Sequence, residues 1–355
     1  MESLTDRLSE FRASLATWYA DQHRHLPWRT RPSLYRTVVS EFMCQQTQIA
    51  TVLPYFERWM QRFPDFQALA DAPSEGVLKL WEGLGYYSRA RNLQRLAQAY
   101  VTADTPPKTV EQWLKYPGVG PYTAAAIASI HFDQPQAVVD GNVVRVLARL
   151  TADGTHFRGG GQAVMHFKAL AGAVLDVDQP GTHNQALMEL GALVCLKHKP
   201  LCTVCPVVKM CAGAQSGEPE RFPRIERAKT ERITVDRLFL RRPEDGAILF
   251  ERARSNSQRL AEIYQLPDAR AVFPEGLPAR SQLLATKQRG ISNQRITERF
   301  FTIPEGSADC SPPADCAFLT PEEIAKATLS GPHRKWLPKL LEACLGRATV
   351  SHDGS

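Results

Sequence analysis

The sequence has no long hydrophobic run. Hydrophobic residues make up 43% of the 355 residues and charged residues 23%, yet no apolar stretch approaches the ~20 residues needed to cross a bilayer. The opening residues, MESLTDRLSEF, are polar and lack the apolar core of a secretory signal. We therefore expect a globular protein without membrane contact that stays in the cytoplasm, where thiols remain reduced.

A strong excess of one charge sign is also missing. The chain has 43 Lys and Arg against 37 Asp and Glu, which gives a net charge of +6. This balance suits a polyanionic partner such as nucleic acid, but it fits a mildly basic enzyme with no such partner equally well. Charge alone leaves the partner open.

The texture of the chain changes near residue 213. Before it, apolar residues recur at helical spacing, as in the stripe that starts at Ile49, so residues 1–212 are predicted to form a helical domain. Residues 213–231 are rich in Gly, Pro and charge, which is typical of a linker. Residues 232–345 hold short β-prone runs and favour an α+β domain, and residues 346–355 are expected to be a disordered tail.

Four of the eight cysteines lie within 17 residues, with the spacing Cys195-x6-Cys202-x2-Cys205-x5-Cys211. Thiols this close together in a reducing compartment indicate a metal site. Zinc fingers usually present two close pairs separated by a longer loop, whereas a compact loop of this kind can wrap a [4Fe–4S] cluster. An iron–sulfur cluster is the favoured interpretation, with zinc and four free thiols as the alternatives.

Two segments are suited to holding a DNA phosphate. The turn Gly118-Val119-Gly120 precedes an apolar, Ala-rich stretch, and backbone N–H groups entering such a helix bind anions without side chains. The cysteine loop carries the cations Lys197, His198 and Lys199, which a metal-tied loop can present to a phosphate. The alternatives are an ordinary connection between two helices and solvated loop charges.

Longer motifs identify a family. The hairpin at 116–123 (YPGVGPYT), the segment 138–143 (VVDGNV) and the cysteine loop, in this order, resemble the endonuclease III branch of the helix-hairpin-helix glycosylases. Residues 26–29 (LPWR), 40–48 (SEFMCQQTQ), 83–92 (GLGYYSRARN) and 184–186 (NQA) are similar to the adenine DNA glycosylase (MutY) family. The resemblance implies a mainly α helix-hairpin-helix domain with a [4Fe–4S] cluster and a C-terminal α+β Nudix-like domain.

Two carboxylic acids fit the chemistry of this family. Glycosidic cleavage passes through an oxocarbenium-like transition state, for which an acid and an anion are a natural pair. Glu41 lies in the apolar run 38–43, so burial can keep it protonated as a general acid. Asp140 opens a helix, where the dipole favours the ionised form. A paired surface acid and a plain N-cap are the alternatives for these two residues.

The resemblance assigns roles around this pair. It implies that Glu41 protonates the adenine, that Asp140 faces the sugar, and that Tyr122 and Asn142 support them. Relatives with lyase activity place a lysine where Tyr122 stands, and a phenol cannot form a Schiff base. The resemblance therefore predicts a monofunctional glycosylase.

The same resemblance implies a set of residues around the mispair. Those beside the opposite base, with the first two as wedges, are Gln45, Tyr86, Gln46, Thr47 and Leu84. Those expected to line the adenine pocket are Arg24, Trp28, Arg29 and Gln185. Core packing or a surface position is the alternative for any one of them. Cys44 departs from the usual leucine and is interpreted as inert packing.

The C-terminal half resembles the family more weakly. It has no Nudix hydrolase box, so pyrophosphatase activity is not expected. The loop that reads 8-oxoguanine in the family aligns with residues 291–295 (ISNQR), which keep Ser292 but lack the aromatic and the histidine. Loss of a stacking aromatic weakens base recognition. The sequence therefore supports the preference for 8-oxoguanine less strongly than it supports the removal of adenine.

Together these features predict a base-excision-repair glycosylase that acts as a monomer on double-stranded DNA, associated with the nucleoid. It would flip out and remove adenine mispaired with 8-oxoguanine or guanine. A thymine or uracil mismatch glycosylase on the same scaffold is the nearest alternative. A non-catalytic binder of damaged DNA is the alternative of another class, disfavoured because Glu41 and Asp140 are both present.

Overall fold

The computed structural model describes residues 7–226, 228–254, 261–304 and 312–350. The chain divides into two compact units. The first contains the residues up to Ala70 and from Arg95 to Ala228, and the second contains Asp71–Gln94 and the chain from Lys229 onward. The second unit thus includes residues 71–94, a segment of the predicted helical domain that the sequence pattern does not distinguish from its neighbours.

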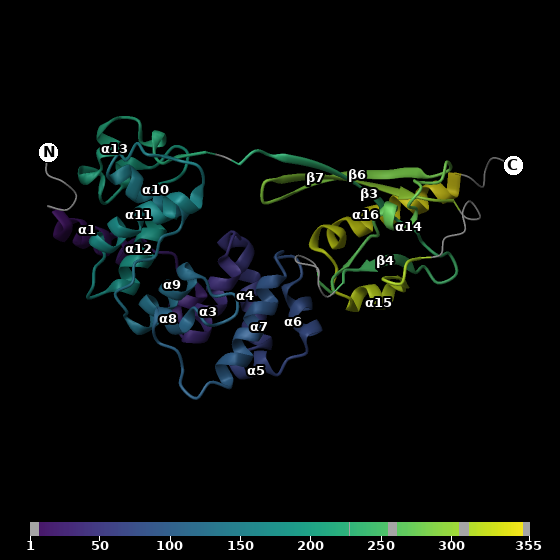
Figure 1. The fold of residues 1–355 in the computed structure, drawn as a ribbon, viewed down its shortest axis with the longest axis horizontal. Coiled ribbons are helices and arrows are strands. Elements are labelled where there is room, and N and C mark those ends of the chain that lie inside the picture. Colours follow the sequence, from purple (N-terminus) through teal and green to yellow (C-terminus); the bar gives the residue numbers. More distant parts are fainter. Residues whose placement is uncertain (1–6, 227, 255–260, 305–311, 351–355) are drawn as a thin grey trace. The chain divides into compact units, whose positions relative to one another are not determined.

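The first unit is helical (Figure 1). Its helices are α1 (Leu8–Gln22), α2 (Pro27–Thr30), α3 (Leu34–Cys44), α4 (Ile49–Arg62), α5 (Phe66–Ala70), α8 (Val110–Trp113), α9 (Pro121–Phe132), α10 (Gly141–Leu150), α11 (Gly160–Val174), α12 (Pro180–Leu193) and α13 (Ala212–Gln215). Helix α7 (Ser88–Val101) crosses between the units. The short strands β1 (His156–Phe157) and β2 (Arg224–Ile225) pair in parallel.

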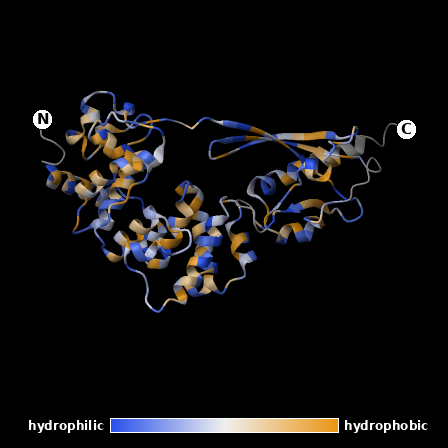
Figure 2. Cartoon of the chain, in the orientation of Figure 1, coloured by the Kyte–Doolittle hydropathy of each residue, from blue (hydrophilic) through white to orange (hydrophobic). Residues whose placement is uncertain are grey.

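The main core of this unit forms between α1, α10, α11 and α12. Hydrophobic and hydrophilic residues interleave along these ribbons (Figure 2), and burying the apolar face of each helix supplies the stability. Helix α12 approaches the first turn of α10 closely: a Cβ on Gly191 would lie 2.6 Å from the Cβ of Asn142. Packing this tight fixes the start of α10, which Asp140 caps.

The second unit combines α6 (Ser74–Trp81) and the first half of α7 with an α+β arrangement. Among the described residues, one sheet has the order β3-β7-β6, with β3 (Glu231–Leu238) parallel to β7 (Gln294–Thr302) and β6 (Gln282–Ile291) antiparallel to it. The other is β5-β4-β8, from β5 (Tyr264–Gln265), β4 (Ile248–Arg252) and β8 (Cys316–Leu319). The helices are α14 (Ala269–Val272), α15 (Pro321–Lys326) and α16 (Gly331–Val350).

The predicted α+β class of this half is confirmed, as are the predicted helices around residues 123–130 and from 141. The predicted linker is different in detail. Residues 213–225 fold against the first unit, because Phe222 is buried and its carbonyl accepts from Arg149. Residues 346–350 continue α16 and are not a disordered tail; residues 351–355 lie outside the described residues.

In the described part of the chain, no helix combines the length and the apolar character that crossing a membrane requires.

Candidate active site

Glu41 lies in the last turn of α3, which Ser33 caps by accepting from the backbone N–H of Arg36. Helix α3 packs on α9, and its apolar residues Val38, Val39 and Phe42 are buried. Glu41 itself is half-buried. Desolvation raises the pKa of its carboxyl to about 7, against an opposing hydrogen bond from Tyr122.

Tyr122 lies in the first turn of α9, directly after the hairpin. Its hydroxyl is hydrogen-bonded to the Glu41 carboxyl and lies 3.3 Å from the Sδ of Met188 on α12. Burial and the nearby charges of Glu41 and Asp140 raise the pKa of this phenol well above its ordinary value. The tyrosine therefore stays protonated and can donate a hydrogen bond to Glu41.

Asp140 is the N-cap of α10. One carboxylate oxygen accepts from the backbone N–H of Val143 at 2.8 Å and the other from Nδ2 of Asn142 at 2.8 Å. Desolvation raises the pKa of Asp140, while these two donors and the charge of Arg145 oppose the rise. The negative charge of Asp140 in turn raises the pKa of Glu41, so the two carboxyl groups lie close enough to influence each other.

A short chain of donors supports the aspartate from behind. Arg145 donates to Oδ1 of Asn142 at 2.9 Å and to the carbonyls of Gly191 and Cys195 at 2.6 and 2.7 Å. Because Oδ1 is occupied by the guanidinium, Nδ2 of Asn142 faces Asp140. The predicted supporting role of Asn142 thus has a geometric basis, and it reaches the cysteine loop.

A second cluster of charges lies between α2, α12 and the segment before α2. Glu189 is 1% exposed; desolvation works against its ionisation, but hydrogen bonds from Arg24 and Arg29 outweigh it and lower its pKa to about 2. Arg24 reaches it at 2.7 Å and Arg29 at 3.1 Å, and Nε of Arg29 donates to Gln185 at 3.1 Å. Three predicted pocket residues are therefore brought together.

Sequence reasoning missed Glu189. Its signal was present: it is the one acid in the otherwise apolar stretch ALMELGALV, on the same helix as Gln185. A carboxylate so placed is rarely buried unless it is paired. Both arginines that are predicted to meet a base edge are held by this carboxylate.

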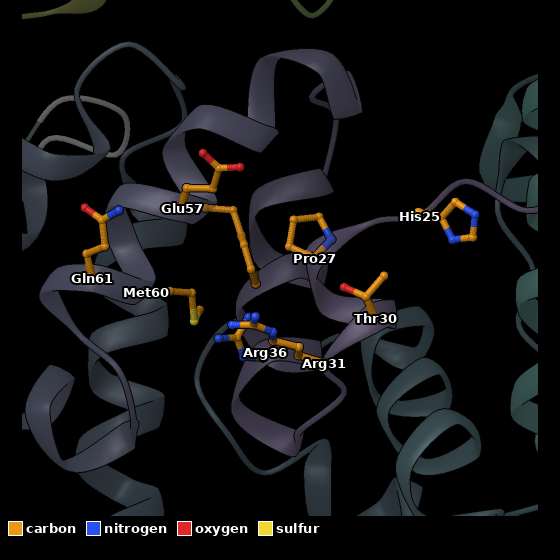
Figure 3. A pocket seen from close by; sticks show the side chains of 9 residues that line it. His25, Pro27, Thr30, Arg31, Arg36, Glu57, Met60 and Gln61 are labelled. Atoms are coloured by element: carbon orange, nitrogen blue, oxygen red, sulfur yellow. The ribbon is translucent and has the colours of Figure 1, made fainter.

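Trp28 lies on α2 with its ring 4.9 Å from that of Phe56, edge to face. Phe56 also lines a hollow on the other side of α2, shown in Figure 3, where the side chains of Arg31 and Arg36 lie together. None of the predicted site residues lines this hollow. Trp28 is half-buried between core and site, which combines the two interpretations of this residue.

The segment after α3 carries the predicted wedge residue Gln45 and two residues predicted to lie near the opposite base, Gln46 and Thr47. Gln45 donates to the hydroxyl of Thr123 on α9 at 3.3 Å. Gln46 is exposed and has a φ of 54°, and the hydroxyl of Thr47 donates to the Gln45 carbonyl. The left-handed backbone at Gln46 turns its side chain outward, where an opposite base can meet it.

The hairpin joins α8 to α9. Gly118 has a φ of 75°, a conformation that favours glycine, and Gly120 is the N-cap of α9 with Pro121 at the first helical position. Val119 is buried between them. Helix, two-glycine turn and helix therefore follow each other as the sequence pattern predicts.

Part of the chain matches a family model. The model of the HhH-GPD superfamily of base excision DNA repair proteins matches residues 39–156, a range that contains Glu41, the hairpin and Asp140. These residues are therefore similar to members of that superfamily.

Individual proteins also resemble this chain over a longer stretch than the HhH-GPD match. An adenine DNA glycosylase of Rattus norvegicus is 47% identical over 219 residues, which are 59% of this chain and 42% of the rat protein. The chain thus spans less than half the length of that relative.

Two solved structures share the fold. A thermostable thymine-DNA glycosylase has a TM-score of 0.52 and 24% identity, over 61% of this chain and 100% of its own. Endonuclease III in a non-covalent complex with DNA has a TM-score of 0.51 and 20% identity, over 61% of this chain and 99% of its own. At these sequence identities, the likeness shows a shared fold and nothing about activity.

The HhH-GPD domain also contains the turn between α6 and α7, which belongs to the second unit. Tyr86 is 42% exposed, whereas Leu84 is 6% exposed. Of the two, Tyr86 is therefore the residue available to a base, and Leu84 packs inward. Ser292, also predicted to meet the mispair, is exposed at the tip of the β6–β7 hairpin with a φ of 56°.

The four clustered cysteines lie outside the HhH-GPD match. Cys195, Cys202, Cys205 and Cys211 line one cavity, together with Arg149 and apolar residues, and no disulfide joins them. Desolvation raises the pKa of Cys205 to about 12 and that of Cys211 above its ordinary value. Buried thiols of this kind become thiolates only against strong positive charge, which a bound metal centre supplies.

The four cysteines offer a donor set that suits a metal centre. Thiols that line one cavity can hold an iron–sulfur cluster or a zinc ion. Within residues 7–226, 228–254, 261–304 and 312–350, no three His, Cys, Asp or Glu side chains converge as the ligands of one metal ion.

The cations of this loop are exposed. The ring of His198 lies 3.3 Å from the Glu220 carboxylate, which also accepts from the backbone N–H of Lys199 at 2.9 Å. The predicted phosphate contact of His198 thus competes with an acid, while Lys197 and Lys199 extend from a loop that Arg149 holds by its carbonyls. Of the other cysteines, Cys316 forms no disulfide with another described residue, and Cys310 lies outside the described residues.

Proposed function

We propose that this chain is a monofunctional DNA glycosylase that removes adenine mispaired with 8-oxoguanine or guanine. The observation that carries the proposal is the constellation Glu41–Tyr122–Asp140, in which one acid has a pKa of about 7 and the other is the better anion. Two carboxyl groups whose environments separate their roles are the general solution for breaking a glycosidic bond.

In the proposed reaction the target nucleotide first leaves the base stack. Glu41 donates its proton to a ring nitrogen of adenine, which turns a poor leaving group into a good one. As the bond from C1′ to the base breaks, positive charge develops on the sugar, and Asp140 stabilises it. Water then adds to C1′, and its proton returns to a carboxylate.

Tyr122 and Asn142 organise this pair. The phenol donates to Glu41, and the amide donates to Asp140 at 2.8 Å. Tyr122 offers no amine, so no Schiff base with the abasic sugar can form at this position. We therefore propose that the product is an intact abasic strand.

Recognition of the mispair is proposed for the residues that flank the acids. Glu189 holds Arg24 and Arg29, and Gln185 accepts from Arg29; these three residues, with Trp28, would line the adenine pocket. Gln45, Gln46, Thr47 and Tyr86 would occupy or border the gap, and Ser292 would read the opposite base. Gly118, Val119 and Gly120, with Lys197, His198 and Lys199, would hold the phosphates of double-stranded DNA bound by a monomer.

The cysteine loop is proposed to hold a [4Fe–4S] cluster through Cys195, Cys202, Cys205 and Cys211. The cluster supplies cationic iron that keeps the four thiols ionised and closes the loop. The chain's own part is to present the loop: Arg149 donates to the carbonyls of Leu196 and Lys197 at 2.6 and 3.0 Å.

The substrate is tested with four duplexes that carry a single A:8-oxoG, A:G, T:G or U:G pair. Each is incubated with the protein and then treated with alkali to cleave abasic sites. We expect product from the two adenine duplexes and none without alkali. Product from the T:G or U:G duplex alone would replace the substrate assignment with a thymine or uracil glycosylase.

The catalytic roles are tested with Glu41→Gln. The amide has no proton to give, so single-turnover excision is expected to fall at least about 100-fold. Binding of the A:8-oxoG duplex should persist, which separates a lost acid from a lost fold. A variant with full activity would refute the role of Glu41.

A further inference from the structure

The turn that presents Tyr86 has an unusual backbone. Gly83, Gly85 and Tyr86 have φ values of 107°, 71° and 47°. A large side chain at positive φ is disfavoured, so it persists only where neighbouring groups hold it.

The middle of the turn is held by its own helices. Nε1 of Trp81 donates to the carbonyl of Gly85 at 3.0 Å. Arg89 donates to the carbonyls of Leu84 and Gly85 at 3.2 and 3.3 Å, and its guanidinium lies 5.3 Å from the centroid of the Tyr86 ring. These contacts set the path of residues 84–86 but leave the two ends.

Both ends of the turn bond to one residue of the C-terminal part of the chain. The backbone N–H of Leu329 donates to Oε2 of Glu82 at 3.0 Å, and the hydroxyl of Tyr87 donates to the carbonyl of Leu329 at 2.7 Å. Leu329 is fully buried and Tyr87 is 2% exposed. The backbone N–H and carbonyl of a single buried residue therefore join the residue before the turn to the residue after Tyr86.

The segment around Leu329 is itself fixed. Nε of Arg334 donates to Oε1 of Glu82 at 2.6 Å, and the same side chain donates to the carbonyl of Ala327 at 2.7 Å. Tyr264 of β5 donates to the carbonyl of Thr328 at 3.0 Å and accepts from the N–H of Ser330 at 2.8 Å. The clamp thus continues into the β5-β4-β8 sheet.

We propose that Leu329 is a clamp through which the C-terminal part of the chain sets the position of Tyr86, with Glu82 and Tyr87 as positioning residues for the wedge. The inference rests on the proposed function, in which Tyr86 enters the gap left by the flipped base. The C-terminal part would then have a second role besides reading the opposite base, which is to hold Tyr86, the proposed wedge residue.

The test is a double-mutant cycle. Tyr87→Phe removes only the hydroxyl that reaches Leu329, and Glu82→Gln weakens the link to Leu329 and Arg334 at constant shape. Each is expected to lower single-turnover excision from an A:8-oxoG duplex about fivefold in the otherwise wild-type chain. In a Tyr86→Ala background the same changes should have almost no effect, because the group that they position is gone.

Matched controls separate positioning from stability. Tyr35→Phe removes another buried hydroxyl that donates to a carbonyl, that of Phe63 at 2.9 Å, and Asp236→Asn breaks an ion pair with Arg299 in the second unit. Any loss that they cause should be the same in both backgrounds. Equal losses from Tyr87→Phe in the two backgrounds, or no loss in either, would overturn the clamp.

The cycle is repeated on duplex affinity, measured by fluorescence anisotropy, which requires no chemistry. If the wild-type chain excises thymine or uracil instead of adenine, the proposed substrate fails, and the cycle is run on that duplex. If it excises nothing, the affinity cycle decides. The clamp and the proposed function therefore fail by different results.

Discussion

At the scale of single residues, the site depends on how burial and hydrogen bonding divide two similar side chains. Glu41 and Asp140 are both desolvated. Asp140 accepts from Val143 and Asn142, whereas the one hydrogen bond that opposes desolvation of Glu41 comes from Tyr122. The difference in donors favours the proposed roles, Glu41 as the acid and Asp140 as the anion.

Tyr122→Phe is expected to raise the pKa of Glu41. The phenol stabilises the ionised carboxylate and so lowers this pKa; without it, the acid keeps its proton to higher pH. The falling limb of the pH–rate profile should therefore move to higher pH. Single-turnover excision measured from pH 5 to 9 checks this, and a limb that moved to lower pH would contradict it.

Glu41→Gln is expected to stabilise the fold at alkaline pH. The pKa of Glu41 is about 7 in the folded chain and near its ordinary value of ~4.3 when unfolded. The wild type therefore loses stability as pH rises through this interval, by about 3–4 kcal/mol, and glutamine does not. Urea unfolding at pH 8 should favour the variant and at pH 4 should not; equal stability at pH 8 would refute the desolvated acid.

At the scale of elements, local signals in the sequence located most of the site. The N-cap at Asp140, the two-glycine hairpin and the apolar run around Glu41 each depend on neighbours within a few residues, so their patterns survive in the sequence. The role of Glu189 could not be predicted, because its partners Arg24 and Arg29 lie about 160 residues away in the sequence. Periodicity carries no information on such pairs.

Gly118→Ala is expected to destabilise the hairpin. Gly118 has a φ of 75°, and a Cβ in that region costs about 1–2 kcal/mol. Gly120 is the matched control, because its φ is −93° and nothing lies within 4 Å of an added Cβ. Chemical unfolding of the two alanine variants compares them. Equal losses at both positions would contradict the strained turn.

Arg149→Met is expected to loosen the cysteine loop. The guanidinium is 1% exposed and donates to the carbonyls of Leu196, Lys197 and Phe222. Removing it leaves these acceptors buried without that donor, at a cost of about 2–4 kcal/mol. Thermal unfolding should show the loss, and iron content per chain should fall; Arg158→Met, at an exposed position, should change neither.

At the scale of the whole molecule, the division of the chain differs from what its texture suggests. The change near residue 213 predicts an autonomous helical domain, yet residues 71–94 form one compact unit with the chain beyond Lys229. The contacts responsible, Glu82 with Arg334 and Tyr87 with Leu329, join residues about 250 positions apart. A change in composition can indicate a domain boundary. It does not indicate which distant segment a helix packs against.

A fragment that ends at residue 228 is therefore expected to be defective. Tyr87 would lose its contact with Leu329, and Glu82 would lose its contacts with Leu329 and Arg334. The fragment should unfold at lower temperature than the full chain and bind a hydrophobic dye. A fragment as stable as the full chain in thermal unfolding would contradict the division into these two units.

The central claim is that a protonated Glu41 and an anionic Asp140 act on one flipped purine nucleotide. Its most direct test is the pH dependence of single-turnover adenine release from an A:8-oxoG duplex by the wild-type chain. With a Glu41 pKa of about 7, the rate constant should be level in acid and fall about tenfold per pH unit above neutrality. A rate constant that stayed level to pH 9 would contradict the claim.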